Sequence, residues 1–131
     1  MLTAASAIAF LPSTDLDRSR RFFADVLGLT ATDASPFACV YRIGATMLRV
    51  TKVNELRVQP FTVFGWQIPD MDAAVRELTD AGVTFLRFDG LDQDARGIWT
   101  TPGVASPHMT RTVVWAGRKR MVDTLPDWPR W

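Results

Sequence analysis

The sequence predicts an α+β domain that is built from two similar modules. Each module starts with a short apolar run that predicts a buried strand, and an amphipathic helix follows at once. The aspartates that start the two helices, Asp15 and Asp70, lie 55 residues apart, and the glycines that end them, Gly28 and Gly82, lie 54 residues apart. Because the spacing is nearly the same at both ends of the helix, the pattern indicates an internal repeat of strand–helix–strand–strand–strand.

The first module covers about residues 5–57, and its helix is the most clearly marked element. Asp15 is suited to cap the N-terminus of this helix and Gly28 to end it. Between them Phe23 belongs to an apolar stripe at helical spacing, and Arg18 lies on the side that is expected to face water. The strands of this module are predicted at 7–11, 29–33, 37–43 and 46–53, with a tight turn at Gly44-Ala45 between the last two.

The second module covers about residues 60–125 and is less regular. Asp70 and Gly82 again bound a helix. The polar segment 89–95 predicts a loop, and the tail 126–131, with two prolines and two tryptophans, is expected to dock on the body of the protein or on a partner chain. Strands are predicted at 61–68, 83–88, 96–101, 111–116 and 119–125.

Length and composition limit the classes of function that the chain is expected to have. Its 131 residues fit one domain over 1–131, and 47% hydrophobic residues is ordinary for a globular protein. With 15 basic and 14 acidic residues the formal net charge is +1, which excludes a generally basic nucleic-acid binder. No apolar stretch approaches the roughly 20 residues that span a bilayer. No cationic segment precedes the apolar residues 2–11, so we expect a cytoplasmic protein without a nucleic-acid or membrane partner.

The single cysteine, Cys39, lies in an apolar run and is predicted to be a buried structural thiol.

Two stretches resemble the helices of the vicinal-oxygen-chelate superfamily, which includes glyoxalases, bleomycin-resistance proteins and extradiol dioxygenases. Residues 15–29, DLDRSRRFFADVLGL, are similar to the signature of its first helix. Residues 69–78, PDMDAAVREL, together with Ala81-Gly82-Val83, are similar to the helix of its second module. The resemblance spans about residues 5–125. It implies two βαβββ modules whose sheets pair into an open half-barrel around a cavity, with a homodimer as the usual assembly.

The resemblance also identifies the positions at which family members hold a metal ion, and this sequence departs from the pattern there. The matching positions are Ile8 and Val63 on the first strand of each module, and Arg49 and Met121 on the last, or Asp123 if the last hairpin is shifted. Ile, Val and Met do not bind Mg²⁺, Mn²⁺, Zn²⁺ or Fe²⁺, and Arg repels them. The chain has one histidine, so no His/His/Glu set can form. The sequence therefore predicts no metal and no other cofactor.

What remains is an apolar groove with a few polar groups, which is the general form of a small-molecule pocket. Residues such as Ile8, Phe10 and Val63 are more often plain core, so core packing is the alternative for all three. Arg49, if it points inward, needs either an anionic ligand or an internal partner such as Asp123, and both possibilities stay open. Trp66 lies on the strand face opposite Val63 and is expected to pack in the core. The candidate ligand-binding residues are Phe10, Met47, Arg49, Val63, Trp99, Trp115 and Met121.

Two classes of function and one structural alternative follow. The first is a metal-free protein that sequesters an aromatic or amphipathic small molecule, as the resemblance to bleomycin-resistance proteins implies. The second is an enzyme of the same superfamily, a lyase, isomerase or dioxygenase-like protein, that acts on a small oxygenated substrate without a metal or with a relocated metal site. Its candidate acids and bases are His108, Tyr41 and Asp123. The third is a structural or regulatory dimer whose groove is filled.

Overall fold

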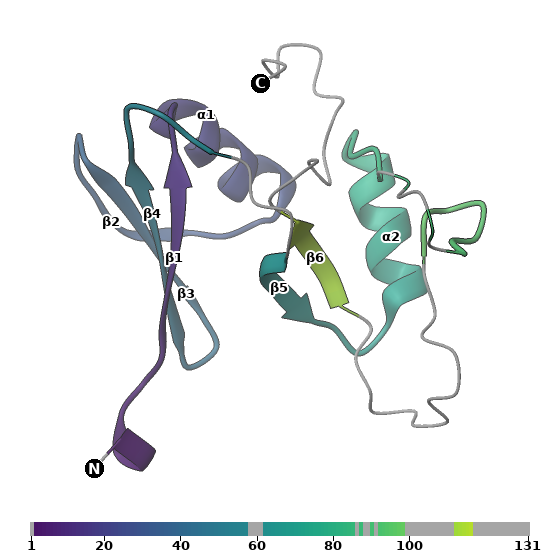
Figure 1. Cartoon of the computed structure of the whole chain (residues 1–131), viewed down its shortest axis with the longest axis horizontal. Coiled ribbons are helices and arrows are strands. Elements are labelled where there is room, and N and C mark those ends of the chain that lie inside the picture. The colour runs from purple at the N-terminus through teal and green to yellow at the C-terminus, as the bar shows by residue number, and fades with distance from the viewer. Residues whose placement is uncertain are drawn as a thin grey trace. The chain divides into compact units, whose positions relative to one another are not determined.

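The structure is a computed structural model, and it describes residues 2–57, 62–85, 87, 90, 92–98 and 112–116. Two compact units make up the chain, Met1–Arg57 and Val58–Trp131 (Figure 1). Within the described residues, no helix has both the length and the apolar character needed to cross a membrane.

Unit one contains a mixed four-stranded sheet and one main helix. In chain order its elements are the short helix η1 (Leu2–Ala4), β1 (Ile8–Ser13), α1 (Leu16–Arg21) with its π-helical continuation η2 (Phe22–Val26), β2 (Ala31–Ala34), β3 (Ala38–Ile43) and β4 (Thr46–Lys52). The sheet order is β1-β4-β3-β2, in which β1 runs parallel to β4 and the other neighbours are antiparallel (Figure 1). The predicted order of strand–helix–strand–strand–strand is confirmed in this unit. Gly44, with φ +56, lies in the predicted turn between β3 and β4.

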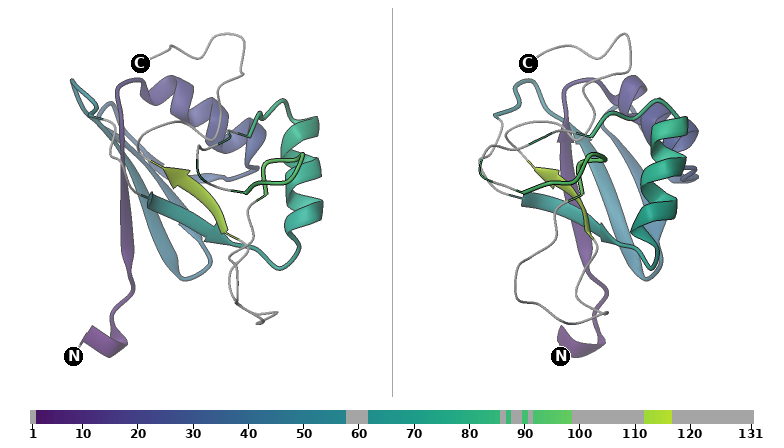
Figure 2. Two further views of the ribbon diagram at one scale, coloured as in Figure 1. Left: turned by 45° about the vertical axis from the view of Figure 1, so that its right-hand side comes forward. Right: turned by 90° about the vertical axis from the view of Figure 1, so that its right-hand side faces the viewer.

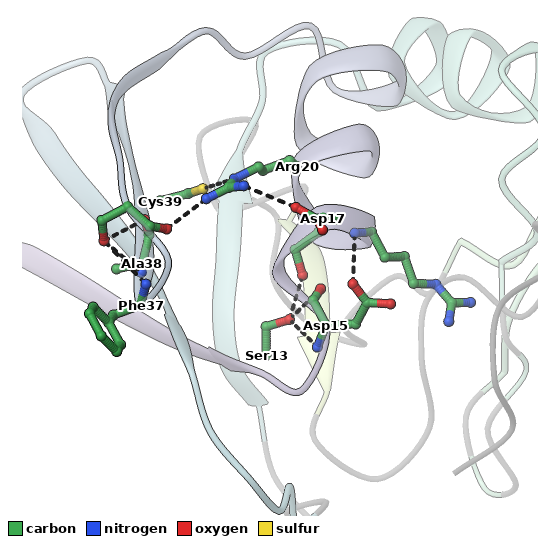
Figure 3. Close-up of polar contacts among 10 residues, drawn as sticks. Ser13, Asp15, Asp17, Arg20, Phe37, Ala38 and Cys39 are labelled. Carbon is green, nitrogen blue, oxygen red and sulfur yellow. Dashed lines mark hydrogen bonds and ion pairs between the residues drawn. The ribbon is translucent and has the colours of Figure 1, made fainter.

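Both main helices begin at the predicted aspartate. The Asp15 side chain accepts a hydrogen bond from the backbone N–H of Arg18 at 3.0 Å (Figure 3). The Asp70 side chain does the same for the backbone N–H of Ala73 at 2.9 Å, at the start of α2 (Met71–Asp80). Each carboxylate satisfies one of the first N–H groups, which have no partner inside a helix.

The predicted glycine also follows each helical segment, one residue after its C-cap. Gly28 has φ +66 and Gly82 has φ +88. This left-handed conformation is one that residues with a Cβ rarely adopt. A glycine at these two positions therefore lets the chain leave the helix without strain.

The core of unit one lies between the sheet and α1, which packs against β3 and β4. Tyr41, Leu48, Val50 and Cys39 are its largest fully buried side chains. Cys39 is 0% exposed, which confirms the predicted buried thiol. The prediction that Arg18 faces water is wrong, because only 8% of this residue is exposed. The long apolar stem of an arginine can cover core surface, which the charge alone does not reveal.

Unit two contains α2 and a two-stranded sheet formed by β5 (Thr62–Gln67) and β6 (Thr112–Ala116) (Figure 2). These strands confirm the predictions for 61–68 and 111–116. β5 and β6 run antiparallel, whereas the first strand of unit one runs parallel to its neighbour. Among the described strands, the two units therefore differ in the direction of the strand that pairs with their first strand. The strand predicted at 119–125 lies outside the described residues.

The strand predicted at 83–88 is not found where the structure describes that segment. Val83 is 3% exposed, and Phe85 packs against a small core formed by Met71 and Val75 of α2. Apolar residues at alternate positions, such as Val83 and Phe85, are typical of a strand. In this segment these side chains are buried or partly buried without a strand partner among the described residues, and Phe85 packs beside α2.

The strand predicted at 96–101 is likewise wrong for its described part, 96–98. The carboxylate of Asp94 accepts hydrogen bonds from the backbone N–H groups of Arg96 and Ile98, each at 2.9 Å, and closes the chain into a turn. The N–H of Ile98, with a smaller effect from Arg96, holds the pKa of the Asp94 carboxyl below its usual range. The loop predicted at 89–95 agrees with the described residues of that segment, apart from an isolated bridge at Gln93.

Candidate functional site

The side of the four-stranded sheet opposite α1 carries the predicted ligand-binding residues of unit one. Between β1 and β4, Ile8 pairs with Met47 and Phe10 pairs with Arg49. Between β3 and β4, Arg42 pairs with Met47. Paired residues point to the same side of a sheet, and successive residues of a strand point to opposite sides. These five residues therefore share one surface, which we call the open face.

The open face is the solvated side of an otherwise closely packed sheet. Phe10 is 64% exposed and Ile8 is 50% exposed. In contrast Leu48 and Val50, the strand neighbours of Arg49, are 0% and 1% exposed. The alternative that Phe10 is plain core is therefore wrong. Large exposed apolar side chains at adjacent positions are typical of binding surfaces.

Arg49 lies beside Phe10 on the open face and is exposed. It has no hydrogen-bond or ion-pair partner among the described residues. The internal partner considered from the sequence, Asp123, lies outside those residues. Arg49 does not point into the core, so water can solvate its charge, and within the described part of the chain no protein group occupies its guanidinium.

Sequence reasoning missed Arg42, which joins Arg49 on the open face. The signal was available in the turn at Gly44-Ala45. A two-residue turn places Ile43 opposite Thr46 and therefore Arg42 opposite Met47, as the structure shows. Arg42 is exposed and, like Arg49, has no hydrogen-bond or ion-pair partner among the described residues.

In unit two the predicted site residue Val63 is 43% exposed, so the plain-core alternative is wrong for it as well. Its strand neighbour Phe64 makes an edge-to-face contact with Trp66 at a centroid distance of 4.7 Å. Trp66 packs against the Met71–Val75 core of α2, as predicted. Val63 itself lies where the pairing of β5 with β6 shifts register, between Thr62 and Phe64.

The side chains at the positions that match family metal ligands do not fit a divalent cation. Ile8 and Val63 have no donor atom, and the guanidinium of Arg49 repels cations. The described residues also contain no group of three or more His, Cys, Asp or Glu side chains that could hold a metal ion. The fourth matching position, Met121, lies outside them.

Tyr41, a candidate acid or base, lies on the helix-covered side of the sheet. It is 1% exposed and stacks on Phe23, with ring centroids 4.9 Å apart. Burial raises the pKa of Tyr41 to about 12, with a further rise from the neighbouring Cys39. The structure therefore does not bring Tyr41 together with the residues of the open face.

Four other predicted site residues lie outside the described part of the chain. They are Trp99, His108, Met121 and Asp123. Trp115 belongs to β6, where its backbone pairs with Phe64. Their roles stay predictions.

A polar hollow of about 380 Å³ at the start of α1 is a second candidate. Its walls include Asp17, Arg20 and Lys52, so both signs of charge are present. The guanidinium of Arg20 donates to the Asp17 carboxylate at 3.0 Å, to the Ser35 carbonyl at 2.7 Å and to the Cys39 sulfur at 2.7 Å (Figure 3). These bonds tie α1 to the end of the β2–β3 hairpin, which is a structural role.

Several solved structures resemble this chain. A bleomycin-binding protein from bleomycin-producing Streptomyces verticillus, complexed with copper(II)-bleomycin, has a TM-score of 0.52 at 20% identity, covering 65% of this chain and 69% of that chain. A bleomycin resistance determinant encoded on the transposon Tn5 has a TM-score of 0.51 at 21% identity, covering 63% and 69%. An integron cassette protein from the Halifax Harbour sewage outfall has a TM-score of 0.50 at 19% identity, covering 61% and 72%. No protein-family model matches the chain, and no curated protein matches its sequence.

These similarities show the fold. The chain has the α+β fold of the bleomycin-resistance proteins, and the predicted vicinal-oxygen-chelate fold is therefore confirmed. A shared fold does not fix the function, which depends on the side chains at the site.

Proposed function

We propose that this chain binds an aromatic or amphipathic small molecule on the open face, without a metal ion and as a binding protein rather than an enzyme. The observation that carries the proposal is the exposure of Phe10, at 64%, beside Ile8, at 50%, on a sheet whose other side is closely packed. Burying an exposed phenylalanine completely is worth about 1.5–3 kcal/mol. Most of that free energy is still available to a ligand at Phe10.

The structural neighbours support a ligand-binding role. One of them forms a complex with copper(II)-bleomycin, so this fold can hold a small molecule. Val63, Trp99, Trp115 and Met121 stay in the proposal as candidate ligand-binding residues of the second module. A homodimer in the cytoplasm, the arrangement expected from the sequence, is part of the same proposal.

A neutral, apolar dye tests the proposal. N-phenylnaphthylamine becomes fluorescent when it leaves water, so a titration of the full chain gives its dissociation constant. We expect Phe10→Ala to weaken binding by about tenfold, which corresponds to about 1.4 kcal/mol. The matched control is Phe37→Ala, because Phe37 is also exposed, at 72%, but lies in the β2–β3 turn. Equal affinities of wild type and Phe10→Ala would contradict the proposal.

The metal-free part of the proposal needs its own measurement. The purified protein is incubated with Mn²⁺, Ni²⁺, Zn²⁺ or Fe²⁺, and metal content is measured together with the thermal unfolding midpoint. Because Ile8, Val63 and Arg49 do not fit a cation, we expect no stoichiometric metal and no rise in the midpoint. One tightly bound metal per chain would overturn this part.

The enzyme alternative depends on an acid or base at the ligand. Tyr41 lies on the other side of the sheet from the open face, so His108 and Asp123 are the remaining candidates. The proposed binding function expects His108→Ala to leave ligand affinity unchanged. If His108 were the general base of an enzyme, His108→Ala would instead lower turnover by about 10²–10⁴-fold.

A further inference from the structure

We propose that the ligand of the open face is an anion, and that Arg42 and Arg49 together hold its negative group. This inference rests on the proposed function, because it names the class of ligand for the same surface. The class is a small molecule with a carboxylate, a sulfonate or another oxyanion group on an aromatic or branched aliphatic body.

The two arginines are diagonal neighbours on the sheet. Arg42 pairs with Met47, and Arg49 is two residues further along β4 on the same side. Diagonal neighbours of this kind lie about 7–8 Å apart. A guanidinium at the end of a long, flexible side chain can cover half of that distance. Both groups can therefore reach one anion.

The charges around the pair favour an external anion. Neither arginine has a partner among the described residues. The carboxylate on the same side of the sheet is that of Asp33, which pairs with Val40, and Val40 in turn pairs with Arg49. Asp33 is therefore two strand spacings from Arg49, or about 10 Å. No ion pair joins the two residues, so the described residues leave an excess of positive charge on the open face.

The apolar part of the open face indicates the chemical character of the rest of the ligand. Phe10 pairs with Arg49 and Ile8 pairs with Met47, so the two apolar side chains on β1 lie beside Arg49 and Met47 on β4. An anion held by the arginines places an attached ring over Phe10. Guanidinium groups bind planar anions through paired hydrogen bonds and stack on rings, so arginine suits both parts of such a ligand. A cationic ligand of the same shape would be repelled.

Two dyes that differ in one charged group test the inference. Anilinonaphthalene sulfonate carries an anionic group that N-phenylnaphthylamine lacks, and the ring systems are the same. The dissociation constant of each dye is measured by fluorescence with the full-length wild type, with the double variant Arg42→Gln/Arg49→Gln, and with Phe10→Ala. The control Arg21→Gln/Arg76→Gln removes the same charge from exposed positions on the two helices.

We expect the wild type to bind the anionic dye about tenfold more tightly than the neutral dye, since charge-assisted hydrogen bonds are the strong ones. The Arg42→Gln/Arg49→Gln variant should lose that difference and keep its affinity for the neutral dye within about twofold. The control variant should keep the difference. Naphthoate should displace the anionic dye at lower concentration than naphthamide does.

The possible failures are distinguishable. If both dyes bind equally and Phe10→Ala weakens both, the open face binds apolar ligands but the anion inference is wrong. If the control variant loses the difference as fully as Arg42→Gln/Arg49→Gln, overall charge explains the preference and the inference is also wrong. If neither dye responds to Phe10→Ala, the proposed function itself fails.

Discussion

The ring of Tyr41 stacks on the ring of Phe23, with centroids 4.9 Å apart and an angle of 27° between the planes. Tyr41 belongs to β3 and Phe23 to η2, so this contact joins the sheet to the helical segment. Both side chains are buried, at 1% and 2% exposure. The same contact that closes the core also keeps the single tyrosine away from the open face.

This stacked pair predicts a large stability effect at Phe23. Phe23→Ala removes a buried ring and leaves a cavity, and such changes cost about 3–5 kcal/mol. Phe37→Ala, at a position that is 72% exposed, should change the free energy of unfolding by less than about 0.5 kcal/mol. Urea unfolding followed by circular dichroism measures both variants. Similar losses in the two would contradict the described core.

Burial of Tyr41 predicts a loss of stability at high pH. Its pKa is raised to about 12, whereas an unfolded tyrosine has a pKa of about 10. An acid whose pKa is raised on folding stabilises the fold below the unfolded value, and this effect is lost as the pH rises toward the folded value. Stability should therefore fall between about pH 10 and pH 12.

The measurement is simple because the chain has one tyrosine. Ultraviolet absorbance of the phenolate should show a transition near pH 12 in the native protein. Tyr41→Phe should lose less stability than the wild type over the same range of pH. A phenolate transition near pH 10 in the folded protein, at the value of an unperturbed tyrosine, would show that the ring is solvated.

The Arg20 contacts predict protection of the single cysteine. Cys39 is 0% exposed, and its sulfur accepts a hydrogen bond from Arg20 at 2.7 Å. Arg20 also donates to Asp17 and to the Ser35 carbonyl. These three contacts hold the Arg20 side chain over Cys39, so their loss should ease local opening.

A thiol-specific disulfide reagent reports that opening. We expect slow reaction of Cys39 in the native wild type and a clearly faster reaction in Arg20→Gln. Arg21→Gln is the control, since Arg21 is exposed and is the next residue along the helix. Rapid reaction of the native wild type would show that Cys39 is accessible.

The ends of α2 predict opposite effects for two aspartates. Asp70 caps the N-terminus through the N–H of Ala73, and its replacement by Ala should cost about 0.5–2 kcal/mol. Asp80 is the last residue of the same helix. A negative charge there opposes the helix dipole, so Asp80→Ala should be neutral or slightly stabilising. Thermal unfolding of both variants measures the difference, and destabilisation by Asp80→Ala equal to that by Asp70→Ala would contradict the capping role.

The sequence predicts those parts of this fold whose signals are local. Asp15, Gly28, Asp70 and Gly82 mark the helix ends because capping depends on a few adjacent residues. The strands of unit one follow from apolar runs separated by turn residues. The position of Phe10 and Arg49 on one surface follows from the alternation of side chains along the strands.

The errors arise where the signal depends on what packs nearby. Alternating burial at Val83 and Phe85 looks the same whether the partner is a strand or the side of α2. The hydrogen bonds of Asp94 turn the chain at a position where the residue pattern alone predicts a strand. Arg18 is buried although its charge predicts exposure. Arg42 was overlooked because its role appears only when the β3–β4 pairing is considered.

The central claim is that the open face is the ligand surface, and backbone nuclear magnetic resonance tests it most directly. The labelled full chain is titrated with naphthamide, a neutral ligand that does not depend on the anion inference. We expect the largest amide shifts on β1 and β4, around Phe10 and Arg49, and little change at the amide of Phe23 in η2. The largest shifts on α1 and η2, or no shifts on β1 and β4, would contradict the claim.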